Sequence, residues 1–486
     1  MDVVLWNAGP DYTPYTIFRT LGPYKISHAT RNAGYTSQVI DHINWMTEEE
    51  LYKCTAKFVD SETSILGIST TFLMAGTHEL PAHALNVLHR LTEEFPNLHV
   101  VFGGYQARDP TLRNVIKAKY SIILEYGEDT FVELLEHRKG KGKLPAFTLI
   151  SRPWGNIKVF KTPIMQKFDI EKDNHLFTDQ DCILPNETLP IEISRGCIFK
   201  CKFCNHLMLG RGKLDYLRSM ECVKQELLHN YEKWNITNYY IICDTFNDTE
   251  YKMQEWHKMV TSLPFKIQYT AYLRADLLDR YPDVPYLLKE SGLISGFHGI
   301  ETLSQHGSTV IGKGWSGKKA KDYIPKLYHD IWGGEVFQTL SFIVGLPGDT
   351  RETFVDTLDW FEQNDLHHMA IHNLGINNNK FNKHLSEFDL NAESYGYTFP
   401  WTERPWAWKN DQWDHDQVEI FVKEQQPRIG KISAWYGSWV TLMLMQYGFD
   451  KSLFKKEASR TAFTVPQLNS LAKEQIQKYV NKLLEL

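Results

Sequence analysis

One stretch of the sequence reads Ser194-Arg195-Gly196-Cys197-Ile198-Phe199-Lys200-Cys201-Lys202-Phe203-Cys204, and its cysteines follow the pattern Cys-x3-Cys-x2-Cys. The preceding residues, Leu189-Pro190-Ile191-Glu192-Ile193, alternate in character and predict a short strand. We therefore expect the cysteines on the loop that leaves this strand. Thiolates crowded onto one loop can bind a single soft metal centre, such as zinc, copper(I) or an iron–sulfur cluster. Three ligands on a four-iron cluster would leave one iron open to a small molecule.

This pattern resembles the cluster loop of the radical S-adenosylmethionine (radical SAM) enzymes. The resemblance implies that Cys197, Cys201 and Cys204 hold a [4Fe-4S] cluster, and that Phe203 packs near the adenine of SAM. In that family the amino and carboxylate groups of SAM chelate the open iron. Reductive cleavage of SAM then yields a 5′-deoxyadenosyl radical, which removes hydrogen from the substrate.

A structural zinc site is the alternative interpretation of the three cysteines. Zinc would require a fourth Cys or His at ordinary spacing, and His206 could supply one. Under this interpretation the chain would be a non-enzymatic metal-binding or nucleic-acid-associated protein. The iron and zinc content of anaerobically purified protein distinguishes the two hypotheses.

Composition and charge indicate a globular protein of several domains and give no sign of a membrane protein. A chain of 486 residues with 42% hydrophobic and 23% charged residues indicates a globular protein of several domains. A formal charge of −6 gives no overall indication of nucleic-acid binding, and it leaves a local basic patch open as an alternative. The sequence contains no secretory signal and no apolar run of about 18 residues, so no membrane partner is expected. Four of the seven cysteines are scattered outside the loop, which favours a reducing cytoplasm.

Residues 1–140 alternate strand-like and helix-like segments, which predicts a Rossmann-like parallel sheet flanked by helices. In such sheets ligands bind outside the carboxyl ends of the strands. The serial order of these ends resembles the cobalamin-binding domain that precedes the barrel in one large radical SAM subgroup. The residues expected to bind cobalamin or another ligand are Gly9, Ser69, Thr70, Gly103, Gly104, Glu125 and Gly127.

The N-terminal segment departs from this resemblance in one respect. The Asp-x-His-x-x-Gly loop of cobalamin domains, whose His ligates cobalt, is absent after the first strand. Many members of the radical SAM subgroup also lack it. The alternative is a radical SAM enzyme of another reaction type, such as oxidation, cyclisation or rearrangement, whose N-terminal domain does not use cobalamin.

Residues 141–188 are expected to form a connector. Prolines occur along this segment at positions 145, 153, 163 and 185, and they favour irregular structure over an independent domain.

Strands and helices alternate again over residues 189–385, with acids or glycines at the strand ends, which predicts a partial (β/α) barrel. The family resemblance implies that Asp244 meets the amino group of SAM, and that Arg274 meets its carboxylate or a neighbouring carboxylate. It also implies SAM contacts from Glu301, Ile343 and Gly345. Alternatively, Asp244 and Glu301 are helix caps or salt-bridged barrel acids, and Arg274 is their partner.

Residues 386–486 are expected to form a mostly helical C-terminal domain. Taken over the whole chain, the family resemblance implies a cobalamin-dependent C-methyltransferase that acts on a small-molecule or peptide substrate. A flavodoxin or ferredoxin would supply the electron. The general acid and base, the substrate and the oligomeric state are not identified by any motif.

Overall fold

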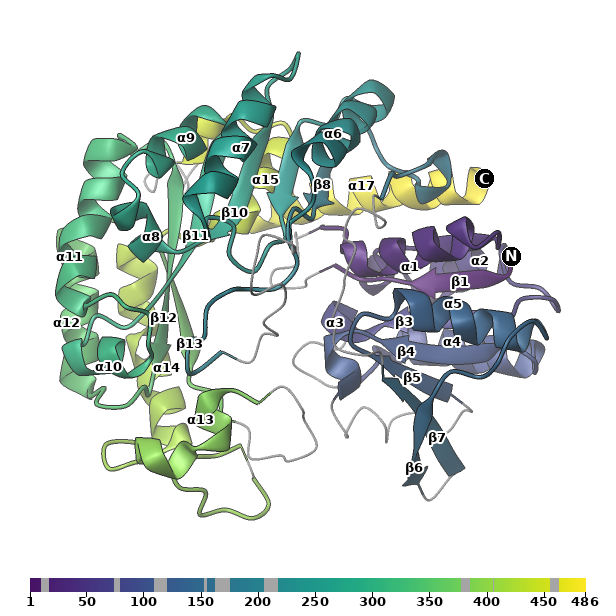
Figure 1. Cartoon of the computed structure of the whole chain (residues 1–486), viewed down its shortest axis with the longest axis horizontal. Helices are drawn as coiled ribbons and strands as arrows, with labels where there is room; N and C mark the ends of the chain where they lie inside the picture. Colours follow the sequence, from purple (N-terminus) through teal and green to yellow (C-terminus); the bar gives the residue numbers. More distant parts are fainter. Residues whose placement is uncertain are drawn as a thin grey trace. The chain divides into compact units, whose positions relative to one another are not determined.

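The computed structural model of the chain describes residues 1–9, 17–73, 79–108, 120–152, 155–161, 175–204, 217–376, 385–404, 406–454 and 463–486. The chain forms two units (Figure 1). The N-terminal unit comprises Met1–Pro190, Glu226–Ile236 and Thr464–Leu486. The barrel unit comprises Ile191–Gln225 and Thr237–Phe463.

A seven-stranded sheet forms the centre of the N-terminal unit, in the order β2-β1-β3-β4-β5-β7-β6. All neighbouring strands are parallel except β6, which runs antiparallel to β7. The strands are β1 (Val3–Trp6), β2 (Ser37–Ile40), β3 (Ile65–Ser69), β4 (His99–Gly103), β5 (Tyr120–Leu124), β6 (Phe147–Arg152) and β7 (Gly155–Lys161). The order 2-1-3-4-5 is that of doubly wound sheets, which confirms the expected Rossmann-like fold.

Helices cover this sheet, with α1 packed against α5 and α2 against α4. Their bounds are α1 (Leu21–Asn32), α2 (Glu48–Ala56), α3 (Thr70–Leu73), α4 (Ala82–Glu94) and α5 (Glu128–Arg138). The middle strand β3 is almost wholly buried. A side chain at Gly67 would lie 2.5 Å from Leu5 Cδ2 on β1, so the glycine permits tight packing there.

The segment 141–188 is more regular than the sequence predicts. Its residues 147–161 contain β6 and β7, and β7 adds a parallel strand beside β5. The physical reason is the alternation in β7, where Ile157 and Val159 are buried on one side of the strand. The alternation of buried and exposed residues in β7 was thus a better indicator of local structure than the prolines, which had favoured an irregular segment.

The C-terminal helix α17 (Val465–Glu485) belongs to the N-terminal unit. The hydroxyl of Tyr479 accepts a hydrogen bond from the Asp41 N–H at 2.8 Å, and Lys482 Nζ donates to the Ile183 carbonyl at 2.8 Å. The buried Arg19 guanidinium lies 5.0 Å from the centre of the Tyr479 ring. The residues 386–486 expected as one domain are thus divided between the two units.

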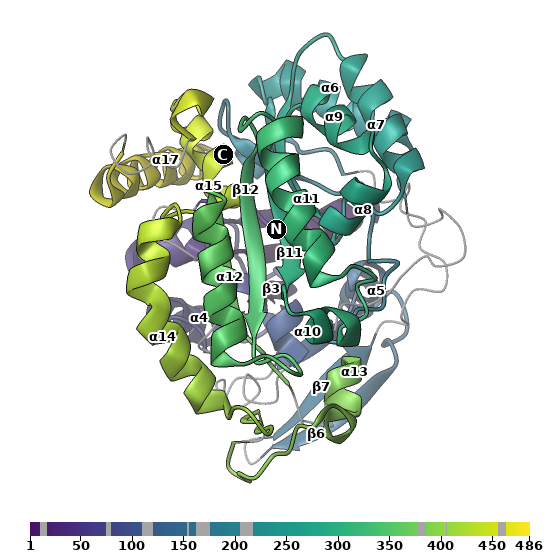
Figure 2. The same cartoon turned by 90° about the vertical axis from the view of Figure 1, so that its left-hand side faces the viewer.

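A second sheet of six strands runs in the order β13-β12-β11-β10-β9-β8. Strands β9 to β13 are parallel, and their spatial order follows the chain, as in a (β/α) barrel. Figure 2 shows two neighbouring strands of this sheet, β11 and β12. The strands are β8 (Thr188–Ile191), β9 (Asn238–Ile241), β10 (Gln268–Leu273), β11 (Leu293–Glu301), β12 (Phe337–Val344) and β13 (His368–Asn373). The expected partial barrel is confirmed.

The helices after β8 follow the strands in turn, and a helical segment follows β13. They are α6 (Met220–Trp234), α7 (Glu250–Thr261), α8 (Ala275–Arg280), α9 (Val284–Glu290), α10 (Gln305–Val310), α11 (Gly317–Lys326), α12 (Arg351–Gln363), α13 (Glu387–Leu390), α14 (His415–Ile432) and α15 (Ser438–Gln446). None of the helices in the described part of the chain is long and apolar enough to cross a bilayer.

The two faces of the second sheet are covered differently. On one face Tyr269 of β10 packs edge to face against Trp256 of α7, with ring centres 5.4 Å apart. On the other face Ser438 of α15 donates to the Gly296 carbonyl at 2.8 Å, and Ser295 donates to the Ser438 carbonyl at 2.9 Å. Helix α15 therefore occupies the inner face of the partial barrel.

Candidate functional site

The cysteine loop is held by contacts on both of its sides. Before the first cysteine, Arg195 Nε donates to the buried Glu192 carboxylate at 2.7 Å. Within the loop, the Cys204 N–H donates to the Cys201 carbonyl at 3.0 Å, which closes a turn. The Lys202 N–H donates to the Ile311 carbonyl at 3.0 Å. The loop is therefore fixed to the carboxyl edge of the second sheet through its backbone.

The three cysteines are half-buried and form no disulfide with one another. Cys197 Sγ lies 3.3 Å from Thr245 Oγ1, and Arg274 Nη1 donates to Cys201 Sγ at 3.3 Å. Burial raises the pKa of the Cys197 thiol, and the Thr245 hydroxyl opposes that shift. A bound metal would supply the positive charge that a thiolate at this position requires.

Arg274 lies in the middle of this edge, directly after β10. Its Nε and Nη2 donate to the two Asp276 carboxylate oxygens at 3.0 and 2.8 Å. Its Nη2 also donates to the Lys313 carbonyl at 2.9 Å. Arg274 was expected to contact either the SAM carboxylate or a neighbouring carboxylate. In the structure it contacts a neighbouring carboxylate, that of Asp276.

Glu301 ends β11 in the left-handed region, with φ +71°, beside a register shift between Gly299 and Glu301. Its carboxylate accepts a hydrogen bond from Lys313 Nζ at 2.8 Å, and Lys313 also donates to the Gly299 carbonyl. The alternative interpretation made Glu301 a salt-bridged barrel acid with Arg274 as its partner; the structure shows the salt bridge, but its cation is Lys313. Left-handed backbone at a residue other than glycine is enriched at functional sites.

The other residues expected to contact SAM differ in exposure. Asp244 follows β9 and is exposed, while Phe203 and Ile343 are half-buried against the barrel core. Gly345 is buried with φ +98°, and a side chain there would lie 2.6 Å from Trp408. Its carbonyl accepts a hydrogen bond from the Tyr397 hydroxyl at 2.7 Å. Packing against Trp408 and Tyr397 thus requires glycine at 345 whether or not SAM is bound.

Two buried charged residues near this edge were not predicted from the sequence. Lys252 of α7 is fully buried, and its Nζ donates to Ser194 Oγ at 2.8 Å and to Asp248 Oδ1 at 3.2 Å. It therefore connects the segment after β9 to the residue that precedes the cysteine loop. Asp248 and Lys252 are four residues apart across the start of α7, and this acid–base spacing was a signal that could have identified them.

The second such residue is Asp349, in the turn after β12. It accepts hydrogen bonds from the Thr302 hydroxyl at 3.2 Å and from the Leu346 N–H at 3.1 Å. Burial raises the pKa of this carboxyl to about 7, and these two hydrogen bonds oppose the shift. Burial of Asp349 therefore favours its protonated form.

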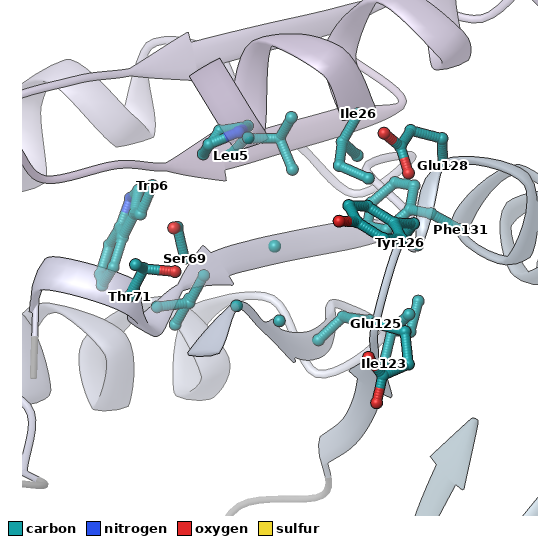
Figure 3. A pocket seen from close by; sticks show the side chains of 18 residues that line it. Leu5, Trp6, Ile26, Ser69, Thr71, Ile123, Glu125, Tyr126, Glu128 and Phe131 are labelled. Carbon is teal, nitrogen blue, oxygen red and sulfur yellow. The ribbon is translucent and has the colours of Figure 1, made fainter. Parts of the chain in front are cut away.

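A cavity of about 180 Å³ lies at the carboxyl ends of β1, β3, β4 and β5 in the N-terminal unit (Figure 3). Five of the seven residues expected to bind a ligand there line it, namely Ser69, Gly103, Gly104, Glu125 and Gly127. The two others, Gly9 and Thr70, are not among the residues that line it. A side chain at Gly9 would overlap the Phe18 carbonyl, and Thr70 Oγ1 donates to the Gly103 carbonyl at 2.8 Å.

The walls of this cavity are mainly apolar, with Leu5 and Trp6 on β1 and Phe131 on α5. Gly103 has open space beyond its Cα, since a Cβ added there would have the Ile123 carbonyl oxygen as its nearest neighbour, at 3.8 Å. Glu125 has φ +70°, so the turn into α5 is also left-handed. The cavity suits a small, largely apolar group.

A larger cavity of about 810 Å³ lies at the opposite edge of the second sheet. Its walls include the segments that enter β10, β11 and β12, among them Gly292 and Val336. Working residues of (β/α) barrels come from the carboxyl edge, so this cavity is not the candidate active site.

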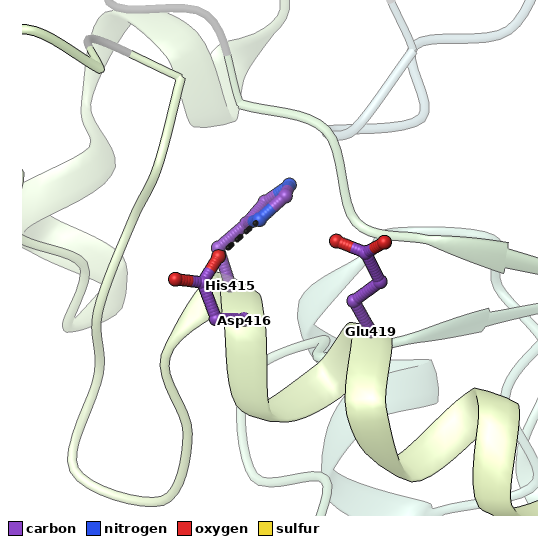
Figure 4. A group of neighbouring side chains, drawn as sticks. All are labelled: His415, Asp416 and Glu419. Atoms are coloured by element: carbon purple, nitrogen blue, oxygen red, sulfur yellow. Dashed lines mark hydrogen bonds and ion pairs between the residues drawn. The ribbon is translucent and has the colours of Figure 1, made fainter.

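Three side chains with metal-ligand chemistry also meet at the start of α14: His415, Asp416 and Glu419 (Figure 4). Both carboxylates already have cations. Arg404 donates to the two Asp416 oxygens at 2.8 and 2.6 Å and lowers the pKa of Asp416 to about 2, while Lys423 pairs with Glu419 at 2.8 Å. This group is accounted for by ion pairs on the surface of the helix.

Comparison with known proteins agrees with the site at the cysteine loop. Residues 191–361 match the family model described as the radical SAM superfamily. The chain therefore contains a radical SAM domain. No curated protein matches the chain.

The fold is similar to two solved radical SAM structures. The methyltransferase TsrM from Kitasatospora setae, with cobalamin and a [4Fe-4S] cluster bound, has a TM-score of 0.63 and 14% identity, and the match covers 95% of this chain and 99% of that one. The cobalamin-dependent enzyme OxsB with aqua-cobalamin bound has a TM-score of 0.58 and 16% identity; the match covers 81% of this chain and 56% of OxsB. At these identities the likeness establishes the shared two-domain fold.

Proposed function

We propose that this protein is a cobalamin-dependent radical SAM enzyme that transfers a methyl group to a carbon atom of a small-molecule or peptide substrate. One observation carries the proposal: a radical SAM domain and a 2-1-3-4-5 sheet, with a cavity at the carboxyl ends of its strands, lie in the same chain. TsrM and OxsB, which share this fold, were solved with cobalamin bound.

The donor set at the cysteine loop fits an iron–sulfur cluster. Three half-buried thiols come from one loop, and an arginine N–H and a threonine hydroxyl lie beside two of the sulfurs. When bound, a cluster with three protein ligands supplies the electron that cleaves SAM and a position for its amino and carboxylate groups. Cys197, Cys201 and Cys204 would hold the cluster, and the backbone contacts of the loop orient them.

SAM would lie at the same edge of the second sheet. Asp244 is exposed there and can accept hydrogen bonds from an ammonium group, while Phe203 and Ile343 offer apolar surface for the adenine. Glu301 reaches this edge from β11 together with Lys313. Gly345 allows Trp408 to pack closely against the turn after β12.

The cavity of the N-terminal unit fits part of a cobalamin molecule. A volume of about 180 Å³ can receive one flat ring system but not a whole corrin. When bound, cobalamin supplies a carrier for the methyl group of SAM. Gly103 leaves room for the inserted group, and Trp6 and Phe131 provide apolar walls.

The experiment that tests the proposal uses anaerobically reconstituted protein with SAM and dithionite, with and without hydroxocobalamin. We expect cobalamin to remain bound through gel filtration, and mass spectrometry to detect 5′-deoxyadenosine and S-adenosylhomocysteine together. 5′-Deoxyadenosine without retained cobalamin would favour the alternative, a radical enzyme whose N-terminal domain has another use. Protein that carries zinc and no iron would contradict both.

We also propose that a flavodoxin or ferredoxin of the cytoplasm supplies the electron in the cell. The scattered positions of the four cysteines outside the loop agree with a reducing compartment. Reduced flavodoxin, used in place of dithionite, should therefore support the formation of 5′-deoxyadenosine.

A further inference from the structure

Arg274 makes four hydrogen bonds through its guanidinium, and one of them ends on a cysteine sulfur. Nε and Nη2 contact Asp276, Nη2 also contacts the Lys313 carbonyl, and Nη1 donates to Cys201 Sγ at 3.3 Å. A guanidinium has five N–H groups, so little donor capacity remains for another ligand.

The guanidinium is held from several directions. It lies 3.9 Å from the centre of the Phe199 ring, within the cysteine loop itself. The Asn247 side chain holds the backbone of the same residue, since Asn247 Oδ1 accepts from the Arg274 N–H at 2.8 Å and Nδ2 donates to the Arg274 carbonyl at 2.9 Å. Arg274 is only 7% exposed. A planar cation fixed in this way delivers its N–H in one direction.

We propose that Arg274 is a positioning residue that tunes the reduction potential of the cluster through Cys201, and that it does not bind the SAM carboxylate. The inference rests on the proposed function in one respect, namely that the three cysteines hold an iron–sulfur cluster. A carboxylate of SAM could engage Arg274 only by displacing Asp276, which holds two of its N–H groups in the fork geometry.

The positive charge of Arg274 determines the direction in which it shifts the reduction potential of the cluster. Reduction adds one negative charge to the cluster and its thiolates, and an N–H donor from a cation stabilises the more negative state. Hydrogen bonds to the sulfurs are among the factors that set the potential of iron–sulfur clusters. Arg274 therefore raises the potential and makes the cluster easier to reduce.

The test compares the wild type with Arg274→Gln, Arg274→Lys and Phe199→Leu. Arg280→Gln is the matched control, because it removes a charge from the exposed end of the same helix. Each reconstituted protein is titrated anaerobically without SAM, with the reduced cluster followed by electron paramagnetic resonance. Iron content and the Kd of SAM are measured in parallel.

We expect Arg274→Gln to make reduction about tenfold less favourable, which is ~59 mV more negative for one electron. Arg274→Lys and Phe199→Leu should shift the potential less in the same direction, and Arg280→Gln should leave it unchanged. The Kd of SAM should change by less than about threefold in all four variants.

An unchanged potential in Arg274→Gln, combined with a Kd of SAM raised tenfold or more, would overturn the inference in favour of a SAM carboxylate role. If Arg274→Gln does not load iron, the reduction potentials of Arg274→Lys and Phe199→Leu test the inference instead. A reduction potential equal to that of the wild type in both variants would contradict it. Failure of the wild type itself to load iron would instead refute the proposed function.

Discussion

The carboxyl edges of the two sheets are built by opposite means. The edge of the barrel unit is lined by paired charges and hydrogen bonds, as between Arg274 and Asp276, Lys313 and Glu301, and Lys252 and Asp248. The edge of the N-terminal unit is lined by apolar side chains and by glycines around a small cavity. The edge of the barrel unit therefore offers polar and charged groups to a ligand, whereas the edge of the N-terminal unit offers a cavity.

The contrast shows what each edge requires from the sequence. Paired charges hold ligand side chains in place before a metal arrives, because buried charges keep fixed partners. A cavity persists only where side chains are missing and the surrounding walls cannot collapse. Substitutions at one edge should therefore leave the other edge unaffected.

The largest effect is expected from Cys201→Ala. Loss of one of three ligands should abolish the cluster and reduce formation of 5′-deoxyadenosine by more than about 1000-fold, since the electron then has no carrier. Iron analysis and mass spectrometry measure both quantities. The control is Cys222→Ala on α6, which should retain the iron content of the wild type. Normal iron content in Cys201→Ala would show that this residue is not a ligand.

Lys252→Met should destabilise the barrel unit by about 3–5 kcal/mol, because it removes the cation from the buried Asp248 carboxylate and the donor from Ser194. Urea unfolding followed by tryptophan fluorescence measures the change in free energy of unfolding. The exposed pair Lys423 and Glu419 on α14 supplies the control, since Lys423→Met should cost less than about 1 kcal/mol. Equal effects of the two substitutions would contradict this role of Lys252.

Asp349 should make the stability of the protein depend on pH. Its folded pKa of about 7 lies above the ordinary value of 3.8, so the folded state binds the extra proton between these values. Stability from this group is therefore fully present below about pH 4 and is lost as pH rises to about 7, by a few kcal/mol in total. Asp349→Asn removes this dependence.

The measurement is the free energy of unfolding of wild type and Asp349→Asn at several values between pH 4 and pH 8. The variant should gain stability relative to the wild type as pH rises through this window. A difference that is constant with pH would show that the carboxyl titrates near its ordinary pKa.

Gly103→Val should weaken cobalamin binding by about tenfold while leaving the iron content unchanged. The Cβ has room at this position, so the two methyl groups would extend into the cavity rather than strain the strand. Equilibrium dialysis with hydroxocobalamin gives the Kd, and Gly103→Ala should show a smaller increase. A loss of iron together with cobalamin would mean that the two edges do not act separately.

Much of the architecture could be predicted from local patterns. The Cys-x3-Cys-x2-Cys spacing, the strand periodicities and the glycines or acids at the strand ends are short-range features, and they identified both sheets and five residues of the N-terminal cavity. The extra strands β6 and β7 were missed, although β7 carried the alternation, because prolines were given more weight.

Sequence alone established which residue types reach the carboxyl edges, since periodicity and chain direction place them there. Which of these residues meet depends on the tertiary structure. Arg274 and Cys201 are 73 residues apart, and Lys252 and Ser194 are 58 apart. The space beside Gly345 is filled by Trp408, and α17 returns to the first sheet through Tyr479 and Asp41. Such pairs depend on how whole helices pack, because a hydrogen bond or contact a few ångströms long is set by every element between its two ends.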